Sequence, residues 1–366
     1  MSVKQATIST IALLGLALLA TPASAGNGPG VTDTEIKIGN IMPYSGPASA
    51  YGTIGKAEAA YFTKINKEQG GINGRKINFV SVDDGYSPPK TVEQARRLVE
   101  EEQVLLIFQS LGTPPNSAIH KYMNAKKVPQ LFVATGATKW GDPKHFPWTM
   151  GWQPTYRTEG KIYAAYVLKN KPDAKIGILM QNDDYGKDYV EGCKMGLGDK
   201  ASKMIVQVAT YEVTDPTVDS QIVTLKGTGA DVFFNVSTPK FAAQAIRKAY
   251  DIDWHPMQFL NNVSASVGTV LIPAGLEKSV GLISTQYAKD PTDPTWKDDK
   301  GYLDWLKFMH DYYPNGEVKE AENVYGYTLA MTLVQVLKQC GNDLSRENVM
   351  KQAAHLKDLQ LPMLLP

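Results

Sequence analysis

The sequence predicts an α/β protein with two lobes, each built on a doubly wound parallel sheet. Continuous apolar runs with strand character alternate with stretches of helical spacing along most of the chain. Such alternation is typical of parallel sheets covered by helices on both faces. The alternation breaks in a loop rich in Pro, Trp and Gly between residues 143 and 156, and then starts again. A chain of 366 residues is also too long for one ordinary core, which favours two domains.

The first 25 residues have the composition of a secretory signal peptide. One cation, Lys4, precedes the apolar stretch 8–20, and the small residues Ala23-Ser24-Ala25 fit a signal-peptidase site. The apolar stretch is too short to cross a bilayer about 30 Å thick. There is no cysteine near the cleavage point, so a lipoprotein is not indicated. We therefore expect residues 1–25 to be removed and the protein to be exported to a bacterial periplasm.

The elements of the first lobe follow in order. Ser87 can cap a helix that Pro88 opens, and Gly70-Gly71 can end the preceding helix. Strands are expected at 36–41, 77–82, 104–108 and 130–133, and helices at 55–67, 90–101 and 117–126.

After the loop at 143–156, which we interpret as a first crossing between lobes, the alternation continues. Strands are expected at 175–180, 205–208, 231–236, 257–260 and 280–284, and helices at 157–169, 188–196, 219–226 and 241–250. A second crossing near 284–287 leads to long helices at 301–312 and 320–339. We predict an N-terminal lobe of residues 26–153 plus 285–360, a C-terminal lobe of residues 154–284, and a multi-strand hinge between them.

Charge and motifs exclude several function classes. Without Lys4, the 38 basic side chains become 37 and balance the 37 acidic ones, so nucleic acid is not an expected partner. The chain contains no Gly-x-Ser-x-Gly, phosphate-loop or His-Glu-x-x-His motif. We therefore expect no catalytic residues, no metal and no cofactor. Cys193 and Cys340 are interpreted as separate buried thiols, with a disulfide as the alternative.

The loops that follow the strands are the expected ligand site, because ligands of open parallel sheets bind beyond the carboxyl ends of the strands. Hydroxyl, amide and aromatic side chains recur in six such loops. Thr113 begins a predicted helix whose N-terminus favours an anion, while Tyr44, Tyr51 and Tyr185 can supply apolar walls. The loops are 43–51, 110–117, 134–140, 181–186, 237–239 and 261–266.

These features together resemble the periplasmic solute-binding proteins of the leucine/isoleucine/valine-binding type, which have the type I periplasmic binding fold and deliver ligands to ABC importers. The resemblance rests on the order and spacing of segments from about Val31 to about Ala354. The matching motifs are 36–52, 70–75, Asp83-Asp84, Pro88, Thr135-Gly136-Ala137-Thr138 and Asp184-Tyr185-Gly186. It implies a monomeric receptor that binds a small solute by hinge closure and presents it to a membrane permease. Because relatives add a strand pair after the last helix, we also expect the final returning segment to be missing here.

The resemblance implies roles for individual residues. Segments 113–116 and 136–138 would hold a ligand carboxylate, with Tyr51 as an aromatic wall and Tyr185 as the tyrosine of the second lobe. The glutamate that pairs with the ligand ammonium in amino-acid-binding relatives falls near 261–263, where this chain has no charge.

A buried ammonium without a carboxylate partner loses several kcal/mol of compensation. The sequence therefore favours a carboxylate ligand that lacks an amine, such as a benzoate or a phenylpropenoate. A branched-chain amino-acid receptor with a rearranged amine site, the sensing domain of a regulator and an enzyme are the alternatives, and Arg157 is a possible charge partner for the carboxylate. The complete set of candidate ligand-binding residues is Tyr44, Ser45, Tyr51, Leu111, Gly112, Thr113, Asn116, Thr135, Gly136, Ala137, Thr138, Tyr156, Tyr185, Ser237, Asn261 and Asn262.

Overall fold

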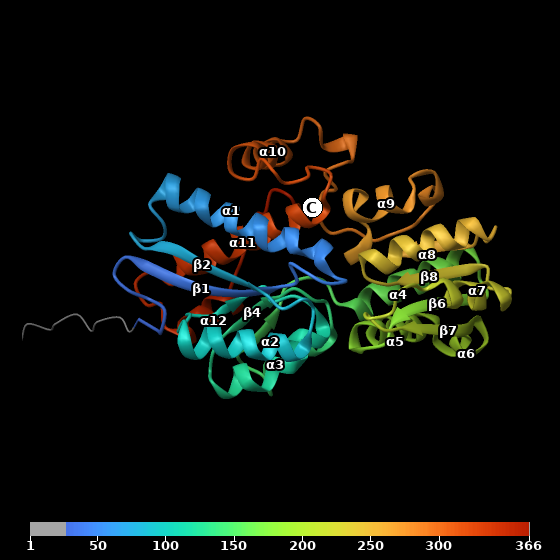
Figure 1. Ribbon diagram of the computed structural model, residues 1–366, viewed down its shortest axis with the longest axis horizontal. Coiled ribbons are helices and arrows are strands. Elements are labelled where there is room, and N and C mark those ends of the chain that lie inside the picture. The colour runs from blue at the N-terminus through green and yellow to red at the C-terminus, as the bar shows by residue number, and fades with distance from the viewer. Residues whose placement is uncertain (1–26, 366) are drawn as a thin grey trace, which may run out of the picture.

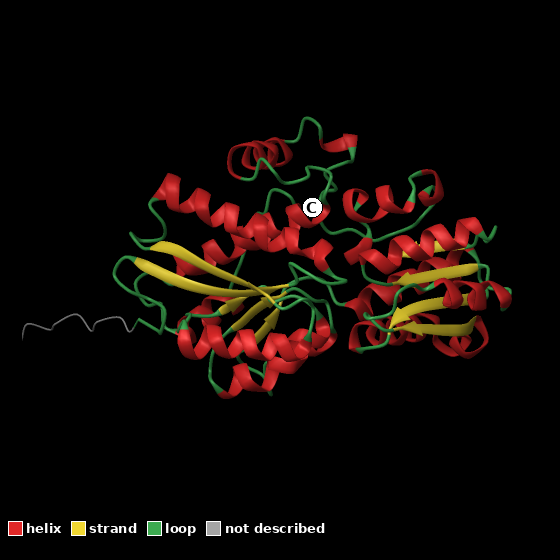
Figure 2. Cartoon of the chain, viewed as in Figure 1, coloured by secondary structure: helices red, strands yellow, loops and turns green. Residues whose placement is uncertain are grey.

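The chain folds into two α/β lobes that lie side by side, each with its own parallel sheet (Figure 1). The computed structural model describes residues 27–365, so the predicted signal peptide lies outside the described residues. Figure 2 shows helices on both faces of each sheet. The predicted α/β architecture with two parallel-sheet lobes is confirmed.

The first lobe holds a five-stranded sheet in the order β2-β1-β3-β4-β5, with every neighbouring pair parallel. Four of the strands lie where the apolar runs predicted them, although β3 is much shorter than the run at 104–108. The fifth, β5, comes from the loop at 143–156, where no strand was expected, and pairs with β4. The strands are β1 (Glu35–Met42), β2 (Lys76–Asp83), β3 (Ile107–Phe108), β4 (Gln130–Val133) and β5 (Thr149–Gly151).

Helices cover both faces of this sheet and come from two distant parts of the chain. Helices α2 and α3 pack on one face around Ile41, Leu98 and Ile107. The other face is covered by α1 together with the C-terminal helices, so residues after 300 complete the first lobe. The helices are α1 (Gly52–Gln69), α2 (Pro88–Arg96), α3 (Thr113–Ala125), α10 (Lys300–Tyr312), α11 (Ala321–Gln339) and α12 (Arg346–Ala354), with short turns η1 (Ser49–Tyr51) and η2 (Arg97–Glu101).

The second lobe holds a four-stranded parallel sheet in the order β7-β6-β8-β9. Helices α4 and α5 cover one face, and α7 and α8 cover the other. The strands are β6 (Ile176–Gln181), β7 (Ile205–Tyr211), β8 (Val232–Val236) and β9 (Met257–Leu260), and the helices are α4 (Tyr156–Asn170), α5 (Asp184–Leu197), α6 (Ala201–Met204), α7 (Asp219–Gly227), α8 (Pro239–Asp251) and α9 (Ile272–Ala274).

The strand expected at 280–284 does not form. Val280 is 84% exposed, and Gly281 has a φ of 86°, which no regular strand adopts. Only Ile283 makes a parallel bridge, to Phe259 of β9. The apolar composition of residues 280–284 predicts a strand, but this segment is a partly exposed loop that leads into the second crossing.

The two crossings and the end of the described chain meet between the lobes. The first crossing runs from β5 to α4, and the second returns through Tyr287. Ala288 forms an antiparallel bridge with Leu364, and Leu365 N donates to Tyr287 O at 3.0 Å. The N-terminus of α11 also reaches the second lobe, since Gly268 N donates to Lys319 O at 3.2 Å.

The two cysteines are buried and free, in separate cores of the two lobes. This agrees with their interpretation as separate thiols. Among residues 27–365, none of the helices combines the length and the apolar character that a membrane span requires.

Candidate ligand-binding site

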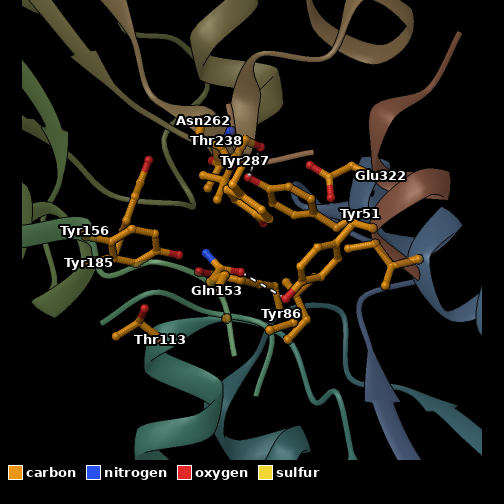
Figure 3. A pocket seen from close by; sticks show the side chains of 16 residues that line it. Tyr51, Tyr86, Thr113, Gln153, Tyr156, Tyr185, Thr238, Asn262, Tyr287 and Glu322 are labelled. Atoms are coloured by element: carbon orange, nitrogen blue, oxygen red, sulfur yellow. Dashed lines mark hydrogen bonds between the residues drawn. The ribbon is translucent and has the colours of Figure 1, made fainter. Parts of the chain in front are cut away.

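A pocket lies between the two lobes, at the carboxyl ends of both sheets (Figure 3). Its atom-free space, which includes solvent at the open mouth, is about 490 Å³. Both lobes and the crossings contribute to the wall. The lining residues are Tyr51, Ile54, Tyr86, Leu111, Gly112, Thr113, Ala134, Gln153, Tyr156, Tyr185, Thr238, Asn262, Val263, Tyr287, Glu322 and Tyr325.

Six of the sixteen lining residues are tyrosines, and hydrogen bonds fix several of their hydroxyls. Tyr51 Oη donates to Val263 O at 3.0 Å, and Tyr325 Oη donates to Gln153 Oε1 at 3.0 Å. The ring of Tyr156 meets that of Tyr185 edge to face, with centroids 5.0 Å apart. Where the hydroxyl is bound to the protein in this way, the ring presents a flat apolar surface to the pocket, suited to an apolar or aromatic ligand body.

One end of the pocket offers hydrogen-bond donors. Helix α3 begins at Thr113, after Gly112 at a φ of 96°, and a Cβ at position 112 would collide with the Tyr86 ring. Pro114 and Pro115 carry no N–H, and Asn116 N donates to Gly112 O at 3.0 Å. The Thr113 N–H is therefore the amide of this helix turn that a ligand anion can reach, with the Tyr86 hydroxyl beside it.

The other end of the pocket carries a carboxyl group, that of Glu322 in the first turn of α11. Burial raises its pKa well above the usual range, and the neighbouring Glu320 raises it further. Glu322 N donates to Glu320 Oε1 at 3.0 Å, but the carboxyl oxygens of Glu322 take no hydrogen bond from any described residue. No lysine, arginine or histidine is among the described residues that line the pocket.

Seven of the sixteen candidate residues line this pocket. They come from the helix η1, from the loop before α3, from the starts of α4 and α5, and from the loop after β9. These residues are Tyr51, Leu111, Gly112, Thr113, Tyr156, Tyr185 and Asn262.

Tyr44, Ser45 and Asn116 lie outside the pocket because their polar groups stabilise the first lobe. The hydroxyl of Tyr44 contacts Ser81 Oγ at 2.5 Å, and Ser45 Oγ donates to Asp83 Oδ2 at 2.5 Å. Asn116 is buried at the start of α3, where its side chain donates to the carbonyl oxygens that precede the helix.

The segment Thr135-Gly136-Ala137-Thr138 is also turned away from the pocket. Thr135 Oγ1 contacts Thr113 Oγ1 at 2.6 Å, and Thr138 N donates to Asp188 Oδ2 at 2.5 Å, across the gap between the lobes. Arg157 pairs with the same carboxylate at 2.8 Å, so it faces this outer contact and not the pocket.

Ser237 and Asn261 lie beneath the pocket wall in the second lobe. Ser237 Oγ donates to Asn235 Oδ1. With its carboxamide oriented to satisfy its partners, Asn261 accepts from Tyr185 Oη at 2.7 Å and donates to Ser237 O at 3.1 Å. These residues position Tyr185 and are covered by it.

Nine lining residues were not among the candidates, and some had a signal in the sequence. Tyr86 lies in the loop after β2, Thr238 follows the candidate Ser237, and Gln153 and Tyr287 lie on the two crossings. Glu322 and Tyr325 had no such signal, because they lie on a helix and not in a loop after a strand. The remaining three are Ile54, Ala134 and Val263.

The comparison with protein families gives one match over nearly the whole described chain. Residues 35–364 match the family described as "Periplasmic binding protein". A curated relative, the Leu/Ile/Val-binding protein homolog 1 of Brucella abortus (strain 2308), is 26% identical over 349 residues, which cover 91% of this chain and 85% of the relative.

Solved structures show the same fold. A substrate-binding periplasmic protein from Ralstonia solanacearum superposes with a TM-score of 0.80 at 21% identity and covers 89% of this chain and 91% of its own. A fatty acid ABC transporter substrate-binding protein from Thermomonospora curvata gives 0.78 at 24% identity, covering 91% and 83%. A branched-chain amino acid ABC transporter protein from Thermus thermophilus with bound valine gives 0.76 at 15% identity, covering 88% and 83%.

Proposed function

This chain belongs to the periplasmic binding protein family, a family of solute-binding proteins that are not enzymes, and from that premise we propose that it is a periplasmic receptor of an ABC import system. Its ligand is a small carboxylate with an aromatic body. The ligand lies in the pocket between the lobes, and hinge closure presents the complex to a membrane permease.

The observation that carries this proposal is the tyrosine-lined pocket, which both lobes and both crossings build. The aromatic ring of the ligand is assigned to the space between Tyr156 and Tyr185 on one side and Tyr51 on the other, since all three line the pocket. Closure across the pocket is supported by the bond from Tyr51 Oη to Val263 O, which joins the two lobes. A ligand seated between these residues adds contacts to both lobes and so favours the closed form.

The ligand carboxylate is assigned to the end of the pocket at Gly112 and Thr113. The support is the free Thr113 N–H, the N-terminal end of α3 and the hydroxyl of Tyr86. The signal peptide predicted for residues 1–25 supports export to the periplasm.

The experiment is thermal unfolding of the mature protein with para-toluate, cinnamate, leucine and valine, each in excess. Aromatic acids should raise the melting temperature, because a ligand that binds only the folded state stabilises it by mass action. A rise with leucine or valine alone would contradict the aromatic ligand, and no rise with any solute would contradict the receptor function for this ligand class.

The second candidate is a receptor for amino acids, and Glu322 favours it. The expectation of a ligand without an amine depended on the absence of a carboxylate from residues 261–263 of the second lobe. Glu322 brings a carboxyl group to the pocket from the first lobe instead. An ammonium group is therefore not excluded on charge grounds.

A further inference from the structure

We propose that the end of the pocket around Glu322, Tyr51, Tyr287 and Tyr325 is a cation subsite that binds an alkylammonium group of the ligand. The inference deepens the proposed function and rests on it, since the same solute places its carboxylate near Thr113. The ligand is then a zwitterion whose opposite charges lie at the two ends of an apolar or aromatic body.

The first support is the carboxyl group itself. Glu322 lines the pocket, and its oxygens take no hydrogen bond within the described part of the chain. Glu322 is partly buried, and a carboxylate that is withdrawn from water without a donor is unfavourable, so protonation of the group or its pairing with a cation is favoured. An ammonium group that enters the pocket supplies both the missing charge and the missing donors.

The second support is the set of aromatic rings around that carboxyl group. Tyr51 comes from η1, Tyr287 from the second crossing and Tyr325 from α11, one turn after Glu322. All three rings line the same pocket as Glu322, and besides the larger effect of burial the charge of Glu322 raises the pKa of each hydroxyl. Rings on several sides of a site attract an alkylammonium ion through their negative faces.

The position of these groups sets the polarity of the ligand. Figure 3 shows Glu322 next to Tyr51, at the end of the pocket away from Thr113. Thr113 offers an N–H at a helix N-terminus, whereas Glu322 offers an acceptor. The two ends therefore select opposite charges, and the apolar wall between them selects the body of the solute.

The charged and titratable groups that face Glu322 are few. Glu320 caps the N-terminus of α11, and Tyr51, Tyr287 and Tyr325 line the same pocket as Glu322. All of these are neutral or negative near neutral pH, so none competes with a ligand ammonium as the positive partner.

The test uses three probes with one ring skeleton: para-toluate, para-methylbenzylamine and para-aminomethylbenzoate. Calorimetry measures their affinities for the mature protein and for Glu322→Gln, which removes the charge and keeps the shape. Glu347→Gln is the matched control, because Glu347 is also the second residue of its helix, α12, and is exposed away from the pocket. The zwitterion should bind most tightly to the mature protein and lose about 30-fold or more in Glu322→Gln, with no change in the control.

Para-toluate should bind Glu322→Gln about as tightly as it binds the mature protein, because it carries no ammonium group for Glu322 to pair with. If the zwitterion binds both proteins equally, or no more tightly than para-toluate, the cation subsite is wrong while the receptor function stands. If none of the three probes binds, the proposed function for aromatic solutes fails together with the inference. Circular dichroism of each variant establishes that it is folded.

Discussion

At the scale of the single residue, Glu322 determines which ligand charge the pocket prefers. In the empty protein, burial raises the pKa of its carboxyl well above the usual range. The protonated form is thus favoured by folding. The stability that the protonated Glu322 carboxyl contributes is complete below the pKa that this group has in the unfolded chain. It is lost as the pH rises through the raised pKa of the folded protein.

The same shift predicts the pH dependence of binding. An ammonium group lowers the pKa of Glu322, so a zwitterionic ligand should release a proton on binding when the pH lies below the raised value. The affinity for para-aminomethylbenzoate should increase as the pH rises from about 5 and then level off. Calorimetry in two buffers with different ionisation enthalpies measures the released proton. Proton uptake, or an equal release in Glu322→Gln, would be inconsistent with this role.

Tyr51 and Tyr44 provide a comparison between a hydroxyl that joins the lobes and one that does not. Tyr51→Phe removes the bond to Val263 O, which is worth about 1 kcal/mol, and should weaken ligand binding by about fivefold. Tyr44→Phe removes a bond to Ser81 within the first lobe, so it should lower stability and leave affinity unchanged. Titration followed by tyrosine and tryptophan fluorescence measures both affinities. Equal losses of affinity in the two variants would contradict the part assigned to Tyr51.

At the scale of elements, α11 links the packing of the first lobe to the pocket. It packs against α1, and a Cβ at Gly326 would lie 2.6 Å from Ile54 O and 3.1 Å from Ala57 Cβ. The glycine permits this close approach of two helices. Because Ile54 and Glu322 both line the pocket, the contact also fixes the spacing of the pocket wall.

Gly326→Ala should therefore lower the free energy of unfolding by about 1–3 kcal/mol through overpacking. The control is Gly227→Ala in α7, where nothing lies within 4 Å of an added Cβ, and it should be neutral or stabilising by up to about 1 kcal/mol. Urea unfolding of both variants measures the difference. A stable Gly326→Ala protein would show that α1 and α11 can move apart without cost.

Most of the elements could be predicted from local pattern, and the exceptions have physical causes. The strands β1 and β6 could be predicted because they are almost continuously buried apolar runs, and α8 could be predicted because its buried residues recur at helical spacing. The strand β5 has three residues and only one of them, Thr149, is buried, so it left no apolar run to detect. The run at 280–284 was misleading because apolar composition alone does not establish burial.

The candidate site could be predicted only where sheet topology determines it. Loops after strands converge at the carboxyl edges of the two sheets, so Thr113, Tyr185 and Asn262 were found. Glu322 and Tyr325 reach the pocket because the second crossing returns α11 to the first lobe with its N-terminus toward the cleft. That placement depends on how the lobes pack, which no local pattern encodes.

At the scale of the whole molecule, the contacts between the lobes should control closure. Asp188 Oδ2 accepts from Thr138 N of the first lobe at 2.5 Å, while Asp188 Oδ1 accepts from Arg157 at 2.8 Å. The bond to Thr138 joins the two lobes, whereas Arg157 and Asp188 both belong to the second lobe, and both bonds lie outside the pocket.

Asp188→Asn should weaken the closed form and lower ligand affinity by about tenfold, because it removes the charge from the bond with Thr138 that joins the lobes. Asp142→Asn is the control, since the contact of Asp142 with His145 lies on the surface of one lobe. Small-angle scattering at a fixed subsaturating concentration of ligand should show a larger radius of gyration for Asp188→Asn alone. Identical scattering from both variants would exclude Asp188 from closure.

The crystal structure of the complex with para-aminomethylbenzoate tests the central claim most directly. We predict one ligand between the closed lobes, with its carboxylate at Thr113 N, its ring between Tyr156 and Tyr51, and its ammonium at the Glu322 carboxyl. A ligand bound in the reverse orientation, or bound outside this pocket, would contradict the account.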